Sequence, residues 1–145
     1  MSINPGAAAL PSAMQIGVVV KDIADTTKFL TSIWGLGPWD IKELSYTKDN
    51  LTVGEPFKIK VAYTHLGGAK LELIQPLEGK SIFSDFLAAK GEGLFNINFH
   101  LANYDEMMSK LEEYQGKLIL EIVKTKRYSY FETKPGGIVV EFAEV

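Results

Sequence analysis

Apolar and polar residues alternate with a period of two along several stretches of the chain, a pattern typical of strands that bury one face. In the clearest stretch, 57–66, aromatic and β-branched residues share one face with His65, while mainly lysine and threonine occupy the other. Gly67 and Gly68 then predict a hairpin turn, whereas the polar residues at 47–56 predict a loop. The predicted strands are 16–20, 39–46, 57–66, 69–75, 94–101, 117–123, 126–132 and 137–143.

Three other stretches place apolar residues three and four positions apart, which is the period of an amphipathic helix. Each follows a residue type that caps helices, so we predict helices after Asp22, Ser81 and Asn103. Glu106 stands three residues after Asn103, which predicts a capping box. Glycines at 35, 91 and 116 are expected to end these helices. The first helix is expected to bury Ile23, Thr27, Leu30, Ile33 and Trp34.

The chain contains the same unit twice. Residues 15–30 match residues 96–111 without a gap, and a later match in each half places Glu72 on Glu141. Each half is predicted to have the order β-α-β-β-β, which makes the fold class α+β with two modules. A duplicated unit usually folds around a pseudo-twofold axis, so residues at matched positions are expected to converge.

Four polar residues occupy such matched positions: Gln15, Glu72, Asn96 and Glu141. Glu72 and Glu141 stand inside apolar strands, where a carboxylate costs free energy unless it is paired, hydrogen-bonded or metal-bound. Alternation along a strand would also allow each of them to face solvent. Gln15 and Asn96 offer carbonyl oxygens and NH2 donors to a site, or to the backbone at a strand end. Their matched positions favour a shared site for small molecules.

Further candidates surround these four residues. Glu43, on the second predicted strand, is a third candidate catalytic carboxylate besides Glu141 and Glu72, although a surface position would also explain it. The candidate ligand-binding residues are Tyr63, His65, Asn98, His100 and Tyr130. The two histidines can act as acids or bases near neutral pH, or can be structural.

Composition narrows the class of protein. The net charge of −3 argues against a nucleic-acid surface, and the absence of cysteine excludes disulfides and thiolate chemistry. No apolar run reaches the roughly 18 residues of a membrane helix, and residues 7–13 lack the basic leader of a signal peptide. We expect a cytoplasmic protein that binds a small molecule and contacts neither nucleic acid nor membrane.

Several segments together resemble the vicinal oxygen chelate superfamily, which includes glyoxalase I, bleomycin resistance proteins and dioxygenases. Within it, the chain is most similar to the methylmalonyl-CoA epimerase and glyoxalase-like branch. The segments are 15–22, 34–37, 71–76, 90–94 and 138–142. The resemblance implies a cupped mixed sheet around a cavity, a small-molecule substrate and, often, a homodimer. From the resemblance together with the pattern along the chain, we expect an arm at 1–13 and one domain at 14–145, made of module one 14–77, a connector helix 78–92 and module two 93–145.

The resemblance also implies a divalent metal held by Gln15, Glu72, Asn96 and Glu141. The family usually has histidine at the first and third positions, and this chain has amides there. Two carboxylates and two amides form an all-oxygen set, which suits Mg or Mn better than Zn or Ni. We therefore expect a metal that is weakly bound or absent.

Two functions are consistent with these residues. The first is a lyase or isomerase that moves a proton on a carbon next to a carbonyl, with Glu141, Glu72 or Glu43 as the proton carrier. The alternative is a metal-free protein of the same superfamily that only binds or sequesters a small molecule. Ring-cleaving dioxygenase chemistry is disfavoured, because it needs iron held by two histidines and a carboxylate.

Overall fold

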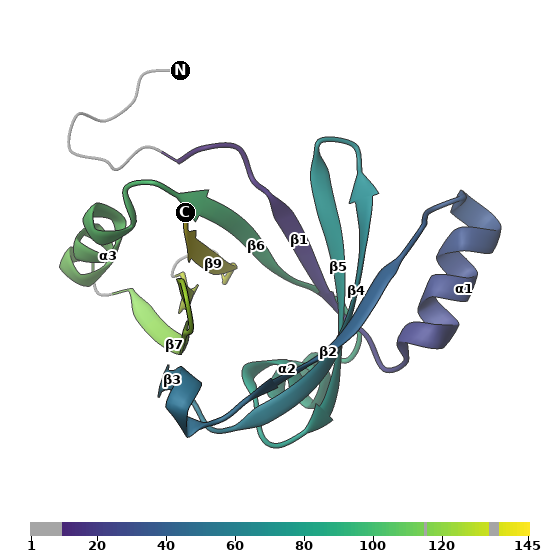
Figure 1. The fold of residues 1–145 in the computed structure, drawn as a ribbon, viewed down its shortest axis with the longest axis horizontal. Coiled ribbons are helices and arrows are strands. Elements are labelled where there is room, and N and C mark those ends of the chain that lie inside the picture. Colours follow the sequence, from purple (N-terminus) through teal and green to yellow (C-terminus); the bar gives the residue numbers. More distant parts are fainter. Residues whose placement is uncertain (1–9, 115, 134–136) are drawn as a thin grey trace.

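The computed structural model describes residues 10–114, 116–133 and 137–145 (Figure 1). Of the predicted arm at 1–13, residues 1–9 lie outside the described residues, and residues 10–13 form neither helix nor strand. The strands are β1 (Gln15–Val19), β2 (Asp40–Tyr46), β3 (Leu51–Val53), β4 (Phe57–Leu66), β5 (Ala69–Glu78), β6 (Gly93–Leu101), β7 (Lys117–Val123), β8 (Arg127–Glu132) and β9 (Val139–Glu144). The α-helices are α1 (Ile23–Trp34), α2 (Ile82–Lys90) and α3 (Tyr104–Glu113), and a short 3-10 helix spans Lys48–Asn50.

One mixed sheet contains all these strands, in the order β2-β4-β5-β1-β6-β9-β8-β7-β3. At its middle β1 and β6 pair antiparallel, and each has a parallel partner from its own half, β5 for β1 and β9 for β6. The second half thus repeats the arrangement of the first, which confirms the predicted α+β fold with paired βαβββ modules. The sheet is strongly curled, so the two modules face each other across its concave side (Figure 1).

The two edges of the sheet are consecutive in the chain. β2 forms one edge and β3 the other, and β3 pairs with β7 of the second module. The prediction of a plain loop at 47–56 was therefore wrong. Leu51 packs against the core cluster, and the Thr52 hydroxyl donates to the Glu121 carboxylate on β7. A strand of three residues depends on this distant partner, so no local pattern revealed it.

Helix α1 covers the outer face of the first module. Asp22 caps it by accepting from the Asp25 amide, and Gly35 ends it with a left-handed backbone, as predicted. Ile23 and Leu30 pack into a cluster with residues of β4 and β5. The prediction that Ile33 and Trp34 are buried was wrong, since they are 64% and 68% exposed. At the exposed end of α1, Trp34 packs edge-on against Phe29.

Helix α2 connects the modules and contributes to the interior of the curled sheet. Ser81 and Ser84 form the capping box at its start. Phe83, 1% exposed, packs against Phe57, Phe95 and Tyr130 from three different strands. The helix therefore joins both modules through one aromatic cluster.

Helix α3 covers the outer face of the second module. Tyr104 and Met107 bury their side chains there against Phe131 and Phe142. The predicted capping box between Asn103 and Glu106 is absent, because the Asn103 side chain makes no cap hydrogen bond. No helix in the described part of the chain is long and apolar enough to cross a membrane.

β1 and β6 approach each other closely at Gly17. Gly17 lies opposite Asn96, and a Cβ atom on Gly17 would overlap the Asn96 side-chain oxygen. Gly17→Ala is expected to lower the free energy of unfolding by about 1–3 kcal/mol, and Asn96→Ala is expected to relieve most of that loss. A double-mutant cycle by urea unfolding measures the coupling. An equal cost of Gly17→Ala in both backgrounds would contradict this contact as its cause.

Candidate functional site

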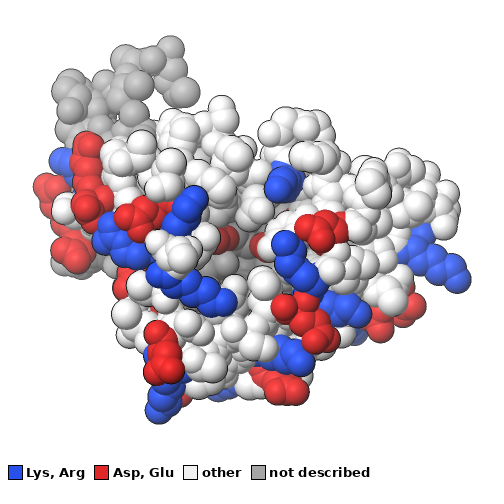
Figure 2. All heavy atoms as spheres, viewed as in Figure 1, with Lys and Arg blue, Asp and Glu red and all other residues white. Residues whose placement is uncertain are grey.

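The concave side of the sheet encloses a cavity of about 360 Å³ that residues of both modules line. Its polar bottom consists of Gln15, Glu72, Asn98 and Glu141, and its walls are aromatic and aliphatic. His100, Lys124 and Thr125 are exposed and lie at its mouth. In Figure 2, acidic atoms are visible inside a hollow near the middle of the face shown, with basic side chains on either side. The cavity therefore combines buried acid groups with an exposed basic mouth.

Strand register places one tyrosine beside each buried glutamate. Glu72 on β5 lies opposite Tyr63 on β4, and Glu141 on β9 lies opposite Tyr130 on β8. Both pairs are antiparallel neighbours, so each phenol lies on the same face as its carboxyl group. The sequence predicted all four residues as site residues but did not predict this pairing. The repeat of the strand order in the two halves was the sequence feature that could have indicated these tyrosine–glutamate pairs.

Glu72 and Glu141 are 7% and 5% exposed, and neither forms a salt bridge among the described residues. Burial raises the pKa of both carboxyl groups, and repulsion from Glu72 raises that of Glu141 further. Hydrogen bonding to the two tyrosines, Tyr63 for Glu72 and Tyr130 for Glu141, offsets part of this shift. The pair therefore retains a proton at a pH where an exposed glutamate would be ionised.

The two asparagines of β6 have different environments. Asn96 is buried behind the cavity, and its Nδ2 donates to Glu141 Oε1 at 3.4 Å. Asn98 lines the cavity and is 1% exposed, and neither its Nδ2 nor its Oδ1 has a partner within hydrogen-bond distance among the described residues, although its amide lies close enough to Glu141 to lower the pKa of that carboxyl group. An unsatisfied buried amide costs free energy, which a ligand that bonds to it would recover. Of the four matched residues, the structure thus brings Gln15, Glu72 and Glu141 to the cavity, and Asn98 takes the place expected for Asn96.

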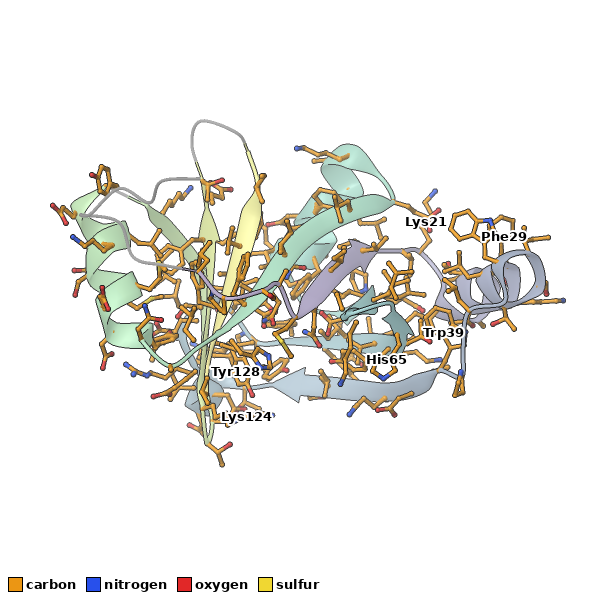
Figure 3. The ribbon with its side chains drawn as sticks, turned by 90° about the horizontal axis from the view of Figure 1, so that it is seen from above. Lys21, Phe29, Trp39, His65, Lys124 and Tyr128 are labelled. Atoms are coloured by element: carbon orange, nitrogen blue, oxygen red, sulfur yellow. The ribbon has the colours of Figure 1, made fainter. Side chains whose placement is uncertain are left out.

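Two other candidates lie outside the cavity. Glu43 was expected near the pocket, but it is on the opposite face of β2 from Leu44 and pairs with Lys58 at 3.3 Å. Leu44 and Tyr46 turn toward the core, so the odd-numbered residues of this strand face outward. His65 is exposed near the end of β4, beside Trp39 (Figure 3).

Of the remaining ligand-binding candidates, Tyr63, Asn98, His100 and Tyr130 line the cavity. Burial and the nearby charges of Lys126 and Lys70 lower the pKa of His100. His100 is therefore a neutral hydrogen-bonding group at physiological pH.

The donor set does not fit a tightly held divalent metal. No group of three or more His, Cys, Asp or Glu side chains suited to a metal exists among the described residues. Asn96 is behind the cavity and directs its NH2 group at Glu141, and the two carboxyl groups interact with Tyr63 and Tyr130. Neutral amide oxygens remain as further donors, and these are weak ligands for transition metals. The site is better suited to proton transfer and hydrogen bonding.

Comparisons with known proteins agree with this architecture. A family model described as the Glyoxalase/Bleomycin resistance protein/Dioxygenase superfamily matches residues 14–131. The uncharacterized protein YqjC of Bacillus subtilis (strain 168) is 30% identical over 134 residues, which cover 89% of this chain and 89% of that protein.

Solved structures with less than 25% identity share the fold. A hypothetical protein from Bacillus halodurans C-125 has a TM-score of 0.67 at 22% identity, covering 92% of this chain and 94% of that one. Methylmalonyl-CoA epimerase from Mycobacterium tuberculosis has a TM-score of 0.67 at 20% identity, covering 93% and 88%. A Streptomyces coelicolor methylmalonyl-CoA epimerase in complex with 2-nitronate-propionyl-CoA has a TM-score of 0.72 at 18% identity, covering 94% and 98%.

The raised carboxyl pKa values predict how stability depends on pH. A carboxyl group whose pKa is higher in the folded chain stabilises the fold below its ordinary pKa, and this contribution is lost as the pH rises through the folded value. Unfolding free energy is therefore expected to fall between pH 5 and 8. The Glu72→Gln/Glu141→Gln variant should match the parent near pH 5 and exceed it by about 2 kcal/mol near pH 8.

Urea unfolding across this pH range measures the difference. Glu43→Gln is the control, because Glu43 is an exposed carboxylate outside the cavity, and it should leave the pH dependence unchanged. A double variant that is less stable than the parent at every pH would show that the two carboxylates hold the fold together instead.

Proposed function

Because the chain belongs to the glyoxalase/bleomycin resistance protein/dioxygenase superfamily, we propose that it is a lyase or isomerase that moves a proton on a carbon next to a carbonyl group. The observation that carries this proposal is the pair of buried carboxyl groups, Glu72 and Glu141, in one cavity with raised pKa values. General acid–base catalysis is most efficient when the pKa of the catalytic group is near the working pH. Burial and repulsion bring the pair toward that condition.

In the proposed reaction, one carboxyl group of the pair is ionised and the other is protonated. One carboxyl group is ionised and takes the proton from the substrate carbon, so a C–H bond breaks and an enolate forms. The other carboxyl group is protonated and delivers its proton to the enolate, which forms the new C–H or O–H bond. The total charge of the pair is the same before and after, with the two glutamates exchanging roles. Tyr63 and Tyr130 keep the carboxyl groups oriented through hydrogen bonds.

Asn98 supplies the group that meets the enolate oxygen. Its buried Nδ2 has no partner among the described residues and lies on the same strand pair as Glu141, directly across from it. A fixed N–H donor in a buried site stabilises charge that develops on a carbonyl oxygen. In this proposal, the Asn98 amide stabilises the enolate oxygen without a resident metal.

Deuterium exchange at carbon tests the proposal. The panel consists of 4-oxopentanoate, 5-oxohexanoate, 4-oxo-4-phenylbutanoate and methylmalonyl-CoA, the last because an epimerase for this ester has the same fold. Incubation in D2O with NMR detection is expected to show enzyme-dependent exchange next to the carbonyl of at least one compound. Glu72→Gln and Glu141→Gln should each slow it by about 10²–10⁴-fold, whereas Glu43→Gln should have no effect.

The second candidate function is binding without catalysis. The apolar walls and the unpartnered Asn98 amide favour it, because they would hold a ligand without any proton transfer. Binding of a panel compound without any enzyme-dependent exchange would contradict the catalytic proposal and support this one.

Asn98 yields a prediction that separates stability from activity. Asn98→Leu is expected to raise the free energy of unfolding by about 1 kcal/mol, because no unpartnered amide stays buried. The same change should slow exchange by about 10²-fold, since the donor to the enolate oxygen is lost. Thermal unfolding and the exchange assay measure both effects on one sample. A less stable variant would show that the Asn98 amide is already satisfied in the free protein.

A further inference from the structure

The mouth of the cavity carries positive charge. Lys124 lies on the turn between β7 and β8, is exposed, and lines the cavity together with Tyr128 (Figure 3). Its Nζ is 4.6 Å from the centre of the Tyr46 ring, another lining residue. This cation–π contact holds the ammonium group over the opening while leaving its N–H donors available.

Two further lysines add to the positive charge at the mouth of the cavity. Lys126 and Lys70 are close enough to His100 at the mouth to lower its pKa. Within the described residues, Lys70, Lys124 and Lys126 form no salt bridge. The only acidic residues among those lining the cavity are Glu72 and Glu141, which are buried at its bottom. The exposed end of the cavity is therefore basic, although the chain as a whole carries a charge of −3.

A substrate that enters this cavity meets charges of opposite sign at its two ends. The bottom disfavours anions, because the acid pair keeps negative charge there even when it holds one proton. The mouth favours them, because an anionic group near Lys124 forms an ion pair without displacing an existing partner. A volume of about 360 Å³ with aromatic walls suits a compact apolar body between these ends.

We infer that the substrate of the proposed function is a small oxo acid with an apolar segment between its carboxylate and its carbonyl, so that the carboxylate binds Lys124 at the mouth while the carbonyl and the adjacent carbon reach Asn98 and the carboxyl pair. This inference rests on the proposed function for the reaction, whereas the binding part can be tested separately. The neutral imidazole of His100 is available as a second hydrogen-bonding group for the carboxylate. The orientation follows from charge, because the reverse placement would put the carboxylate against Glu72 and Glu141.

Equilibrium binding of matched acids and esters tests the inference. The probes are 4-oxopentanoate, 5-oxohexanoate and 4-oxo-4-phenylbutanoate, in which an apolar segment separates the carboxylate from the ketone, each compared with its methyl ester at low and high salt. At least one acid is expected to bind about tenfold more tightly than its ester, which is the size expected for one partly exposed ion pair. Added salt should reduce this preference. Calorimetry, or the shift in melting temperature, measures the affinities without requiring turnover.

Three variants test whether Lys124 causes the preference for the acid over its ester. Lys124→Gln should lower the affinity for the acid about tenfold and leave the ester unchanged, and Lys124→Arg should retain the preference for the acid. Lys28→Gln makes the same change of charge on the outer surface of α1 and should have no effect.

Three results would each overturn the inference. They are an ester that binds as tightly as its acid, a preference for the acid that survives Lys124→Gln, and no binding of any acid at millimolar concentration. If an acid binds through Lys124 but shows no deuterium exchange, only the proposed reaction fails.

Discussion

The buried pair of Glu72 and Glu141, with no ion-pair partner among the described residues, is the constraint on which the site depends. Two buried carboxyl groups in one cavity cannot both ionise at low cost, so the fold must supply hydrogen bonds and tolerate a retained proton. Tyr63, Tyr130 and Asn96 supply those bonds. The apolar cluster around Phe83 on α2 supplies stability beside the cavity. The burial that makes this carboxyl pair costly in the empty protein is thus also the basis of the proposed proton transfer.

Duplication explains the symmetric part of this site, and a single glycine explains the asymmetric part. Each module contributes one tyrosine–glutamate pair across adjacent antiparallel strands. The residues beside the glutamates on the central strands differ, since Gly17 neighbours Glu72 and Asn98 neighbours Glu141. The missing side chain at Gly17 makes room for Asn96 to lie behind the cavity. Glu141 therefore has a buried amide directly across from it on the neighbouring strand, whereas Glu72 has a glycine there, so the two halves of the site differ.

The sequence predicted the parts of the fold that depend on local pattern and on the repeat. Helices α1 and α2 begin at the capping residues it indicated, and three of the four matched residues line the cavity. Strand β3 was missed because only its pairing with β7 makes it a strand. Asn96 and Asn98 share one strand face, and alternation alone cannot say which of them the curled sheet turns into the cavity. Glu43 was misplaced because alternation puts it on the same face as Trp39 without showing which side that face covers, and Trp39 packs toward α1 on the outside.

The distribution of charge along the cavity determines which ligands the cavity favours. An acid pair at the bottom creates an unfavourable potential for any anion, so a site with no compensation would select neutral compounds. The lysines at the mouth reverse that selection only for a ligand whose charge stays at the opening. Separation of the anionic group from the reacting carbon is then a requirement of the site. In the proposed reaction, a carboxylate held away from the glutamates would not add to the negative charge that the enolate brings to Asn98, and the amide could stabilise that charge alone.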